Sequence, residues 1–116
     1  MKNVFLTSFL FLLFFQVSNV INAQTTQASF VGTWKMNPSN PSHSLSKIKI
    51  VDNGSSVTVT LKNAPFKKFT GKFDSVERKL YITINNITYF FVHVPANDSL
   101  MGYELLSGNM FANYIK

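Results

Sequence analysis

Apolar and polar residues alternate in short runs along most of the chain from Phe30 onward. In each of the first runs the apolar side chains fall on every second position, so that one face is apolar and the other is polar. This pattern is typical of antiparallel strands that pack one face on a core and expose the other to water. The runs that alternate in this way are residues 30–36, 45–51, 57–61, 69–73 and 80–84.

The last third of the chain continues as strands with a different pattern. Residues 87–94 are apolar on both faces, and residues 110–115 form a final short run. Residues 100–106 fit either a strand or a short helix that Ser99 would cap. Gly102 in the middle of this run favours the strand, because glycine weakens the interior of a helix.

Turn signals separate these runs and predict hairpins. Asp52-Asn53-Gly54 and Asn85-Asn86 contain residues that tolerate the positive φ of tight turns, whereas Ala64-Pro65 is expected to interrupt a strand. About eight short strands joined mostly by hairpins indicate an all-β, antiparallel, up-and-down meander. We expect a closed or nearly closed barrel in which the final strand pairs with the first, because closure removes exposed edges.

The N-terminal segment, residues 1–23, has the pattern of a cleaved secretory signal peptide. Lys2 supplies a positive charge, residues 4–17 form a mostly apolar core, and Ala23 is a small residue suited to the cleavage site. An uncleaved anchor is the alternative, but the apolar core is shorter than the roughly 20 residues of a spanning helix. We therefore expect a secreted or periplasmic protein that does not span the membrane after cleavage.

The rest of the chain is predicted to be a flexible lead, residues 24–29, followed by a single domain, residues 30–116. The chain has no cysteine, so its stability depends on packing and strand pairing without a disulfide. Lys and Arg number 11 against 5 Asp and Glu, which gives a formal net charge of +6.

The first predicted strand contains the single tryptophan of the chain. The run Gly32-Thr33-Trp34-Lys35, continued to Pro38, resembles the start of lipocalins and fatty-acid-binding proteins, and more closely that of small secreted bacterial lipocalin-like domains. The resemblance implies a calycin-type, lipocalin-like β-barrel in which Gly32 and Trp34 are structural and Trp34 packs at the closed end.

The chain is shorter than a typical lipocalin, which would leave no length for a lid. A small eight-stranded barrel has an interior that its own side chains nearly fill, or that holds one small ligand. We expect a largely filled interior. The side chains expected to fill it are Leu61, Phe69, Phe73, Ile82 and Ile84.

Few residues in the sequence suit catalysis. His43 and His93 lack the close spacing of a zinc site, and Asp74 and Glu77 lie in a predicted turn, where acidic side chains are usually solvated. The sequence has no cysteine, no glycine-rich phosphate loop and no nucleophile-elbow motif. We therefore predict a protein that is not an enzyme, with no catalytic residue, no cofactor and no metal.

A basic stripe is predicted on the outer face of the middle strands. Alternation turns Phe69 and Phe73 inward and the lysines of the same and neighbouring strands outward. These lysines either keep the protein soluble and its strands unpaired, or bind an anionic partner such as an acidic glycan or an anionic envelope surface. Export argues against nucleic acid as that partner. The lysines of this predicted face are Lys47, Lys49, Lys62, Lys68 and Lys72.

Two sets of aromatic residues are candidates for binding. Because residues 87–94 are apolar on both faces, one face would be exposed on a monomer unless a neighbouring segment covers it. The candidate apolar interface is Tyr89, Phe90, Phe91 and Val92. The candidate ligand-binding residues at the mouth of the barrel are Phe66, Tyr81 and Tyr89.

These features favour a non-enzymatic binding module for a small apolar ligand or a protein partner. A secreted peptidase inhibitor is one alternative, because a proline-stiffened loop loses little entropy when it docks. A structural subunit of an envelope or an oligomer is another. The candidate inhibitory loop, called the Pro loop below, consists of Asn37, Pro38, Ser39, Asn40, Pro41, Ser42, His43 and Ser44.

Overall fold

The computed structural model describes residues 25–116, and the predicted signal peptide lies outside these residues. A short 3-10 helix, η1 (Gln27–Phe30), precedes the strands. The strands are β1 (Gly32–Met36), β2 (Lys47–Asp52), β3 (Val57–Leu61), β4 (Ala64–Asp74), β5 (Lys79–Ile84), β6 (Ile87–Val94), β7 (Ser99–Glu104) and β8 (Met110–Ile115). Within the described part of the chain, no helix is long and apolar enough to cross a membrane.

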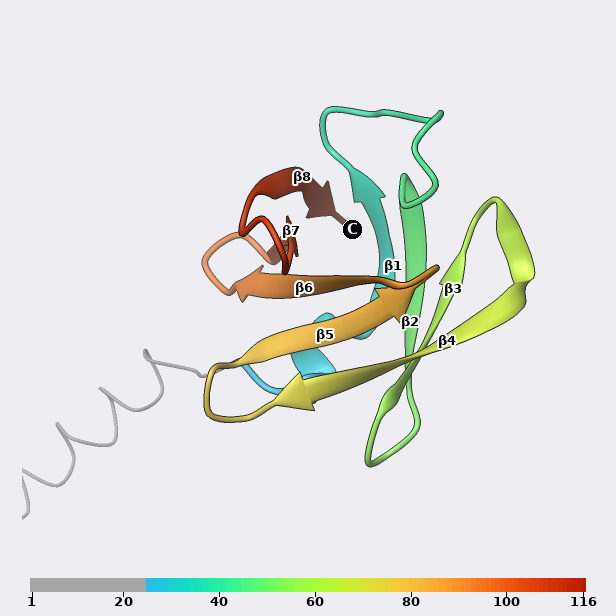
Figure 1. Cartoon of the computed structure of the whole chain (residues 1–116). Coiled ribbons are helices and arrows are strands. Elements are labelled where there is room, and N and C mark those ends of the chain that lie inside the picture. The colour runs from blue at the N-terminus through green and yellow to red at the C-terminus, as the bar shows by residue number, and fades with distance from the viewer. Residues whose placement is uncertain (1–24) are drawn as a thin grey trace, which may run out of the picture.

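The strands form one closed antiparallel barrel in chain order (Figure 1). Each strand pairs with its sequence neighbours, and β8 returns to β1, where Lys35 lies opposite Ile115 and Met36 opposite Tyr114. The predicted all-β, up-and-down fold is therefore confirmed. Residues 99–104 form β7, so that the strand is the correct alternative for this part of the chain.

Two of the predicted turns have the expected backbone. Asn85 and Asn86 join β5 to β6 with φ angles of 52° and 67°, the conformation that a two-residue hairpin turn requires at both positions. Gly54, in the loop between β2 and β3, has a φ of 95°. Local sequence chemistry thus determines both hairpins.

The predicted strand break at Ala64-Pro65 is wrong. β4 begins at Ala64, and the chain turns at residues 62–63 instead. In the pairing with β3, Ala64 lies opposite Leu61, but the next paired residue of β4, Lys68, lies opposite Thr60. Residues 65–67 therefore have no partner in β3. A bulge of this kind accommodates Pro65, which has no N–H to donate to the ladder.

Every strand except β4 contributes buried apolar side chains to the interior. β4 contributes Phe69 and Phe73, which are half-buried and pack against this core. Gly71 and Gly102 lie where a side chain would collide with this core. A Cβ on Gly71 would stand 2.7 Å from Val57 Cγ2, and one on Gly102 would stand 2.8 Å from Phe111 Cζ. The interior is therefore tightly packed at these positions. Leu61, Ile82 and Ile84 are buried as predicted.

The short helix η1, which includes part of the predicted lead and Phe30, packs against the barrel. Phe30 at the end of η1 is fully buried, and its carbonyl oxygen accepts a 2.8 Å hydrogen bond from Trp34 Nε1. The Gln27 amide nitrogen lies 2.9 Å from both Asp52 Oδ1 and the carbonyl oxygen of Gly54. These contacts fix η1 to the loop between β2 and β3.

Candidate binding surface

Lysines occupy the outer side of the sheet over β1 to β4. Alternation sends them outward while Trp34, Ile48, Ile50 and Phe69 face the core, so each lysine side chain is exposed. We call this surface the basic face. Its residues are Lys35, Lys47, Lys49, Lys62, Lys68 and Lys72. Lys35 was not part of the predicted stripe and joins it because β1 pairs with β2.

The register brings like charges together on the basic face. Lys35 lies directly opposite Lys47 in the pairing of β1 with β2. Lys49 lies opposite Thr60, which in turn lies opposite Lys68. Like charges in directly opposed positions destabilise a sheet. The arrangement is thus one that stability alone does not favour.

No carboxylate of the described residues pairs with the basic face, and four of the five acidic side chains contact other groups. Asp52 accepts from the Gly54 amide at 2.7 Å, and Asp74 accepts from two amides of the following turn at 2.9 Å. Glu77 contacts Lys79 and accepts from the Tyr81 hydroxyl. The ion pairs among residues 25–116 involve Lys79, His93 and Lys116, none of which belongs to the basic face.

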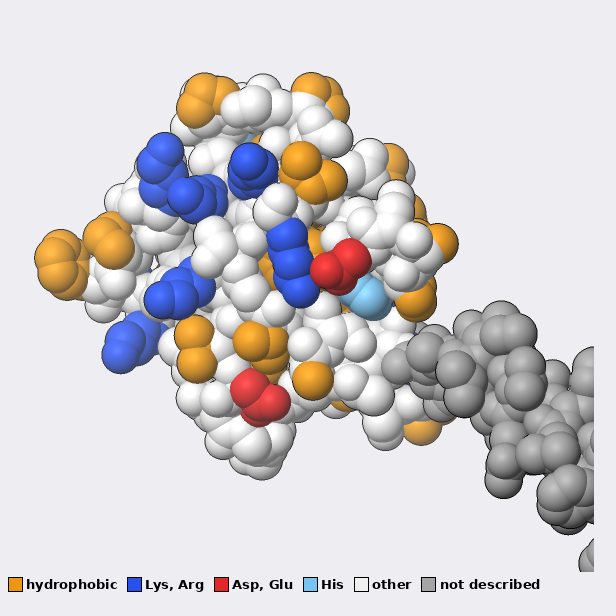
Figure 2. Space-filling model, turned by 180° about the vertical axis from the view of Figure 1, so that it is seen from behind, with side chains coloured by type: hydrophobic (Ala, Val, Ile, Leu, Met, Phe, Trp, Pro, Cys, Tyr) orange, Lys and Arg blue, Asp and Glu red, His pale blue; other side chains and the backbone are white. Residues whose placement is uncertain are grey.

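The basic face is hollowed. One hollow of about 300 Å³ is lined by Lys47, Lys49 and Lys62 together with Thr33, Thr60 and Pro65, over Ile48 and Leu61. A neighbouring hollow shares Lys47 and Lys62 with it and reaches Lys35 and the Pro loop. A third shares Lys49 and Thr60 and reaches Lys68. Figure 2 shows Lys and Arg side chains gathered on this side of the molecule, with few acidic side chains among them.

An aromatic ladder crosses the outer side of β5, β6 and β7. Tyr81 lies opposite Phe90, and Phe90 lies opposite Tyr103. The Phe90 and Tyr103 rings stack with centroids 4.9 Å apart, and Lys79 Nζ lies 4.7 Å from the Phe90 centroid. All three aromatic residues are half-buried. The ladder is thus largely covered by its own members and by Lys79.

The predicted apolar interface on β6 divides between the two faces of the strand. Phe91 is buried and Tyr89 packs against the core, whereas Phe90 and Val92 lie on the outer side. Tyr89 stands edge-on to Phe111 at 5.3 Å, and burial, followed by the charge of Glu104, raises the pKa of its hydroxyl. Only Phe90 and Val92 of this set are therefore placed to meet a partner.

The predicted mouth residues do not converge. Phe66 projects from the β4 bulge with 96% of its surface exposed. Tyr81 lies on the outer face, where its hydroxyl donates to Glu77 at 2.8 Å, and this hydrogen bond is the main cause of the raised pKa of Tyr81. Tyr89 alone faces inward. The structure therefore does not bring these residues together around one ligand.

The Pro loop is exposed along most of its length but is folded into turns. The His43 amide donates to the Asn40 carbonyl at 3.1 Å, and the Ser46 amide donates to the His43 carbonyl at 3.0 Å. The His43 ring stacks on Phe111 with centroids 5.6 Å apart. A peptidase inhibitor normally presents an extended segment to a cleft, so this conformation gives the inhibitor hypothesis little support.

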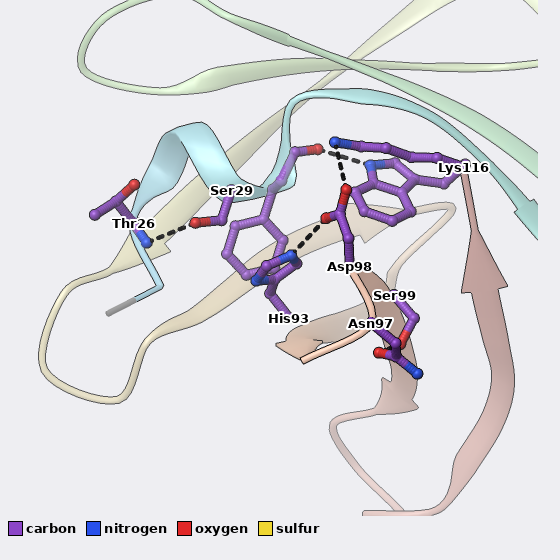
Figure 3. A network of polar contacts seen from close by, with 9 residues as sticks. Thr26, Ser29, His93, Asn97, Asp98, Ser99 and Lys116 are labelled. Carbon is purple, nitrogen blue, oxygen red and sulfur yellow. Dashed lines mark hydrogen bonds and ion pairs between the residues drawn. The ribbon is translucent and has the colours of Figure 1, made fainter. Parts of the chain in front are cut away.

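A polar network lies at the end of the barrel beneath η1 (Figure 3). His93 Nε2 and Asp98 Oδ1 are 2.8 Å apart, and Lys116 Nζ lies 3.2 Å from Asp98 Oδ2. The hydrogen bond to His93, assisted by Lys116, lowers the pKa of Asp98. This network could not be predicted from the sequence, because it depends on the register of β6 and β7, which brings Asp98 in the turn back to His93.

One nitrogen of this network has no hydrogen-bond partner among the described residues. The other ring nitrogen of His93, Nδ1, is buried without a hydrogen-bond partner, so no hydroxyl nucleophile is held there. The His93 ring instead packs edge-on against Phe30 and Trp34. Among residues 25–116 no three metal-ligating side chains form a cluster. The network joins the C-terminal end of the described chain to the β6–β7 turn.

The described residues form a small closed β-barrel that is tightly packed around Gly71 and Gly102, with a hollowed basic face whose lysines have no ion-pair partner among residues 25–116. Comparison of the chain with protein-family models, with curated proteins and with solved structures gives no match. A function must therefore be argued from the structure.

Proposed function

We propose that the protein is an exported, non-enzymatic binding module on a lipocalin-like barrel, and that it binds an anionic partner through the basic face. The observation that carries the proposal is the absence of any acidic partner for these lysines in residues 25–116, although the register sets Lys35 against Lys47. A surface arranged at a cost in stability is expected to have a use outside the fold.

The lipocalin-like assignment rests on the Gly32-Thr33-Trp34-Lys35 start together with the closed barrel. A lipocalin that carries a ligand inside needs a cavity. The close approach of Val57 to Gly71, and of Phe111 to Gly102, favours binding outside the barrel over an apolar ligand within it. Carriage of a small apolar ligand therefore has less support than recognition at the outer surface.

The other hypotheses also have less support. A protein partner on β6 would meet Phe90, but this ring is already stacked on Tyr103 and covered by Lys79. A peptidase inhibitor would require an extended Pro loop rather than one folded into turns. A structural subunit remains a hypothesis for which no surface of the described residues gives specific support.

The test compares a sulfated polymer with its neutral counterpart. The exported protein is expected to bind dextran sulfate and not dextran, with an affinity that falls as salt rises because exposed charges are screened. K47Q/K49Q should weaken this binding strongly. The matched control is R78Q/K79Q, which removes the same charge from the β4–β5 turn and the start of β5, outside the basic face. Equal binding of both polymers, or equal weakening by both variants, would overturn the proposal.

A further inference from the structure

The bulge in β4 carries the most exposed large apolar side chain of the described residues. The pairing of β3 with β4 leaves residues 65–67 outside the ladder. Phe66, at their centre, is 96% exposed. Its neighbour Pro65 lacks a backbone N–H, which suits a segment without a strand partner. In Figure 1 this end of the β3–β4 hairpin projects from the body of the barrel.

Three lysines lie close to this aromatic tip along the chain. Lys67 follows Phe66 in the bulge, Lys62 lies in the turn before it, and Lys68 begins the paired part of β4. Pro65 and Lys62 also line the hollow that contains Lys47. The tip is therefore continuous with the basic face and not a separate surface.

Leu106 provides an internal comparison. It is 95% exposed, nearly as much as Phe66, but it lies in the loop between β7 and β8. Glu104 is the charged residue closest to it along the chain, and no lysine lies between β7 and the end of β8. An exposed apolar residue as such is ordinary on a protein surface. The combination of an exposed aromatic side chain with neighbouring lysines that continue into the basic face is what distinguishes Phe66.

We infer that the anionic partner is a lipid bilayer with anionic head groups, with Phe66 entering the interface and the surrounding lysines contacting the head groups. This inference rests on the proposed function and specifies its partner. Lysine stems can lie along apolar matter while their charged ends stay among head groups. A weak apolar insertion and a polybasic patch together give stable peripheral attachment where either alone does not. A soluble polyanion would use the lysines but would have no use for Phe66.

The experiment measures binding of the exported protein, its N-terminus defined by mass spectrometry, to phosphatidylcholine vesicles with and without phosphatidylglycerol. Dextran sulfate is measured in parallel. The protein is expected to bind only the vesicles that contain phosphatidylglycerol. F66S should weaken this binding about tenfold, since partial loss of an aromatic burial energy corresponds to roughly one decade in affinity. It should leave dextran sulfate binding unchanged, and the control L106S should change neither.

The outcomes separate the two claims. Binding to dextran sulfate without binding to anionic vesicles overturns the membrane inference and leaves the proposed function intact, whereas failure of both overturns both. Equal loss of vesicle binding in F66S and L106S also overturns the inference. F66W supplies a second readout that does not depend on affinity. The fluorescence of the introduced tryptophan should shift to the blue on anionic vesicles, whereas the emission of buried Trp34 should stay constant. An unchanged spectrum would contradict insertion of the tip.

Discussion

The hydroxyl of Tyr114 donates a 2.7 Å hydrogen bond to the backbone carbonyl of Leu45, and both residues are buried. Tyr114 lies on β8 and Leu45 lies just before β2, so the bond joins the last strand to the end of the loop that follows the first. It lies where the pairing of β8 with β1 consists of two residue pairs, Lys35 with Ile115 and Met36 with Tyr114. This contact therefore reinforces the closure of the barrel.

Y114F should reduce stability, because it leaves the buried Leu45 carbonyl without its donor. We expect a loss of about 1–3 kcal/mol in the free energy of unfolding, the usual cost of an unsatisfied buried group. Chemical denaturation of the two proteins at neutral pH measures this difference. A variant as stable as the wild type would show that the bond does not contribute to closure.

The same residue predicts a response to alkaline pH. Burial raises the pKa of Tyr114 above its ordinary value of 10.0. Above pH 10 the unfolded chain releases this proton while the folded chain retains it, so the free energy of unfolding falls as pH rises. The fall should be smaller in Y114F. If the free energy of unfolding falls equally steeply in both proteins between pH 9 and pH 11, the raised pKa of Tyr114 does not contribute to the response.

Packing of the interior is tested at Gly71. G71A should destabilise the barrel by about 1–3 kcal/mol, as overpacked cores do, because its Cβ would stand 2.7 Å from Val57 Cγ2. Adding V57A removes the colliding methyl, so the double variant should be less destabilised than the sum of the two single variants. Strict additivity in this double-mutant cycle would show room around Gly71 and would reopen the case for an interior ligand.

Replacement of Asp98 tests how much the ion pairs at the end of the barrel contribute to stability. D98N removes the partner of both His93 and Lys116. Since the Asp98 side chain is 53% exposed, solvent screens the pair, and we expect a cost of no more than about 1 kcal/mol at neutral pH. The pKa of Asp98 is lowered, so its contribution is present above the ordinary pKa of 3.8 and is lost as pH falls through the folded value. Wild type and D98N should therefore converge in stability in acid.

A conflict between stability and binding is expected at Lys35. K35E converts its pairing with Lys47 from like to opposite charges. The free energy of unfolding should rise by about 0.2–1 kcal/mol, the range for cross-strand pairs, while binding to dextran sulfate weakens. Denaturation midpoints and binding isotherms of the same preparation measure both. If K35E lowers stability or leaves binding unchanged, the lysines are not arranged as proposed.

The strands and several turns follow from local sequence chemistry. Strict alternation placed Leu61, Ile82 and Ile84 in the core, and the Asn85-Asn86 pair determined its hairpin. The break expected at Pro65 was wrong, because the sheet bulges around the proline and the chain turns before it. Proline signals the loss of a ladder hydrogen bond, and a bulge satisfies that requirement as well as a strand end does.

Features that depend on tertiary contact could not be read from the sequence. The bonds of Gln27 to the β2–β3 loop, and of Asp98 to His93, join residues that the folded chain brings together. Lys35 joins the basic face because of the β1–β2 register. The outward position of Tyr81 is different: its alternation with buried Leu80 and Ile82 already excludes it from the interior, so this position was predictable.

Mapping of the bound surface by NMR shows whether the basic face is the surface that binds the anionic partner. Backbone amide shifts of the exported protein are followed as a short dextran sulfate is added, with neutral dextran as the control. We expect changes concentrated on β1 to β4 around Lys47, Lys49 and Lys68, and reversal of these changes by salt. Changes centred on inward-facing Tyr89 and Phe111, or on the Pro loop alone, would contradict it.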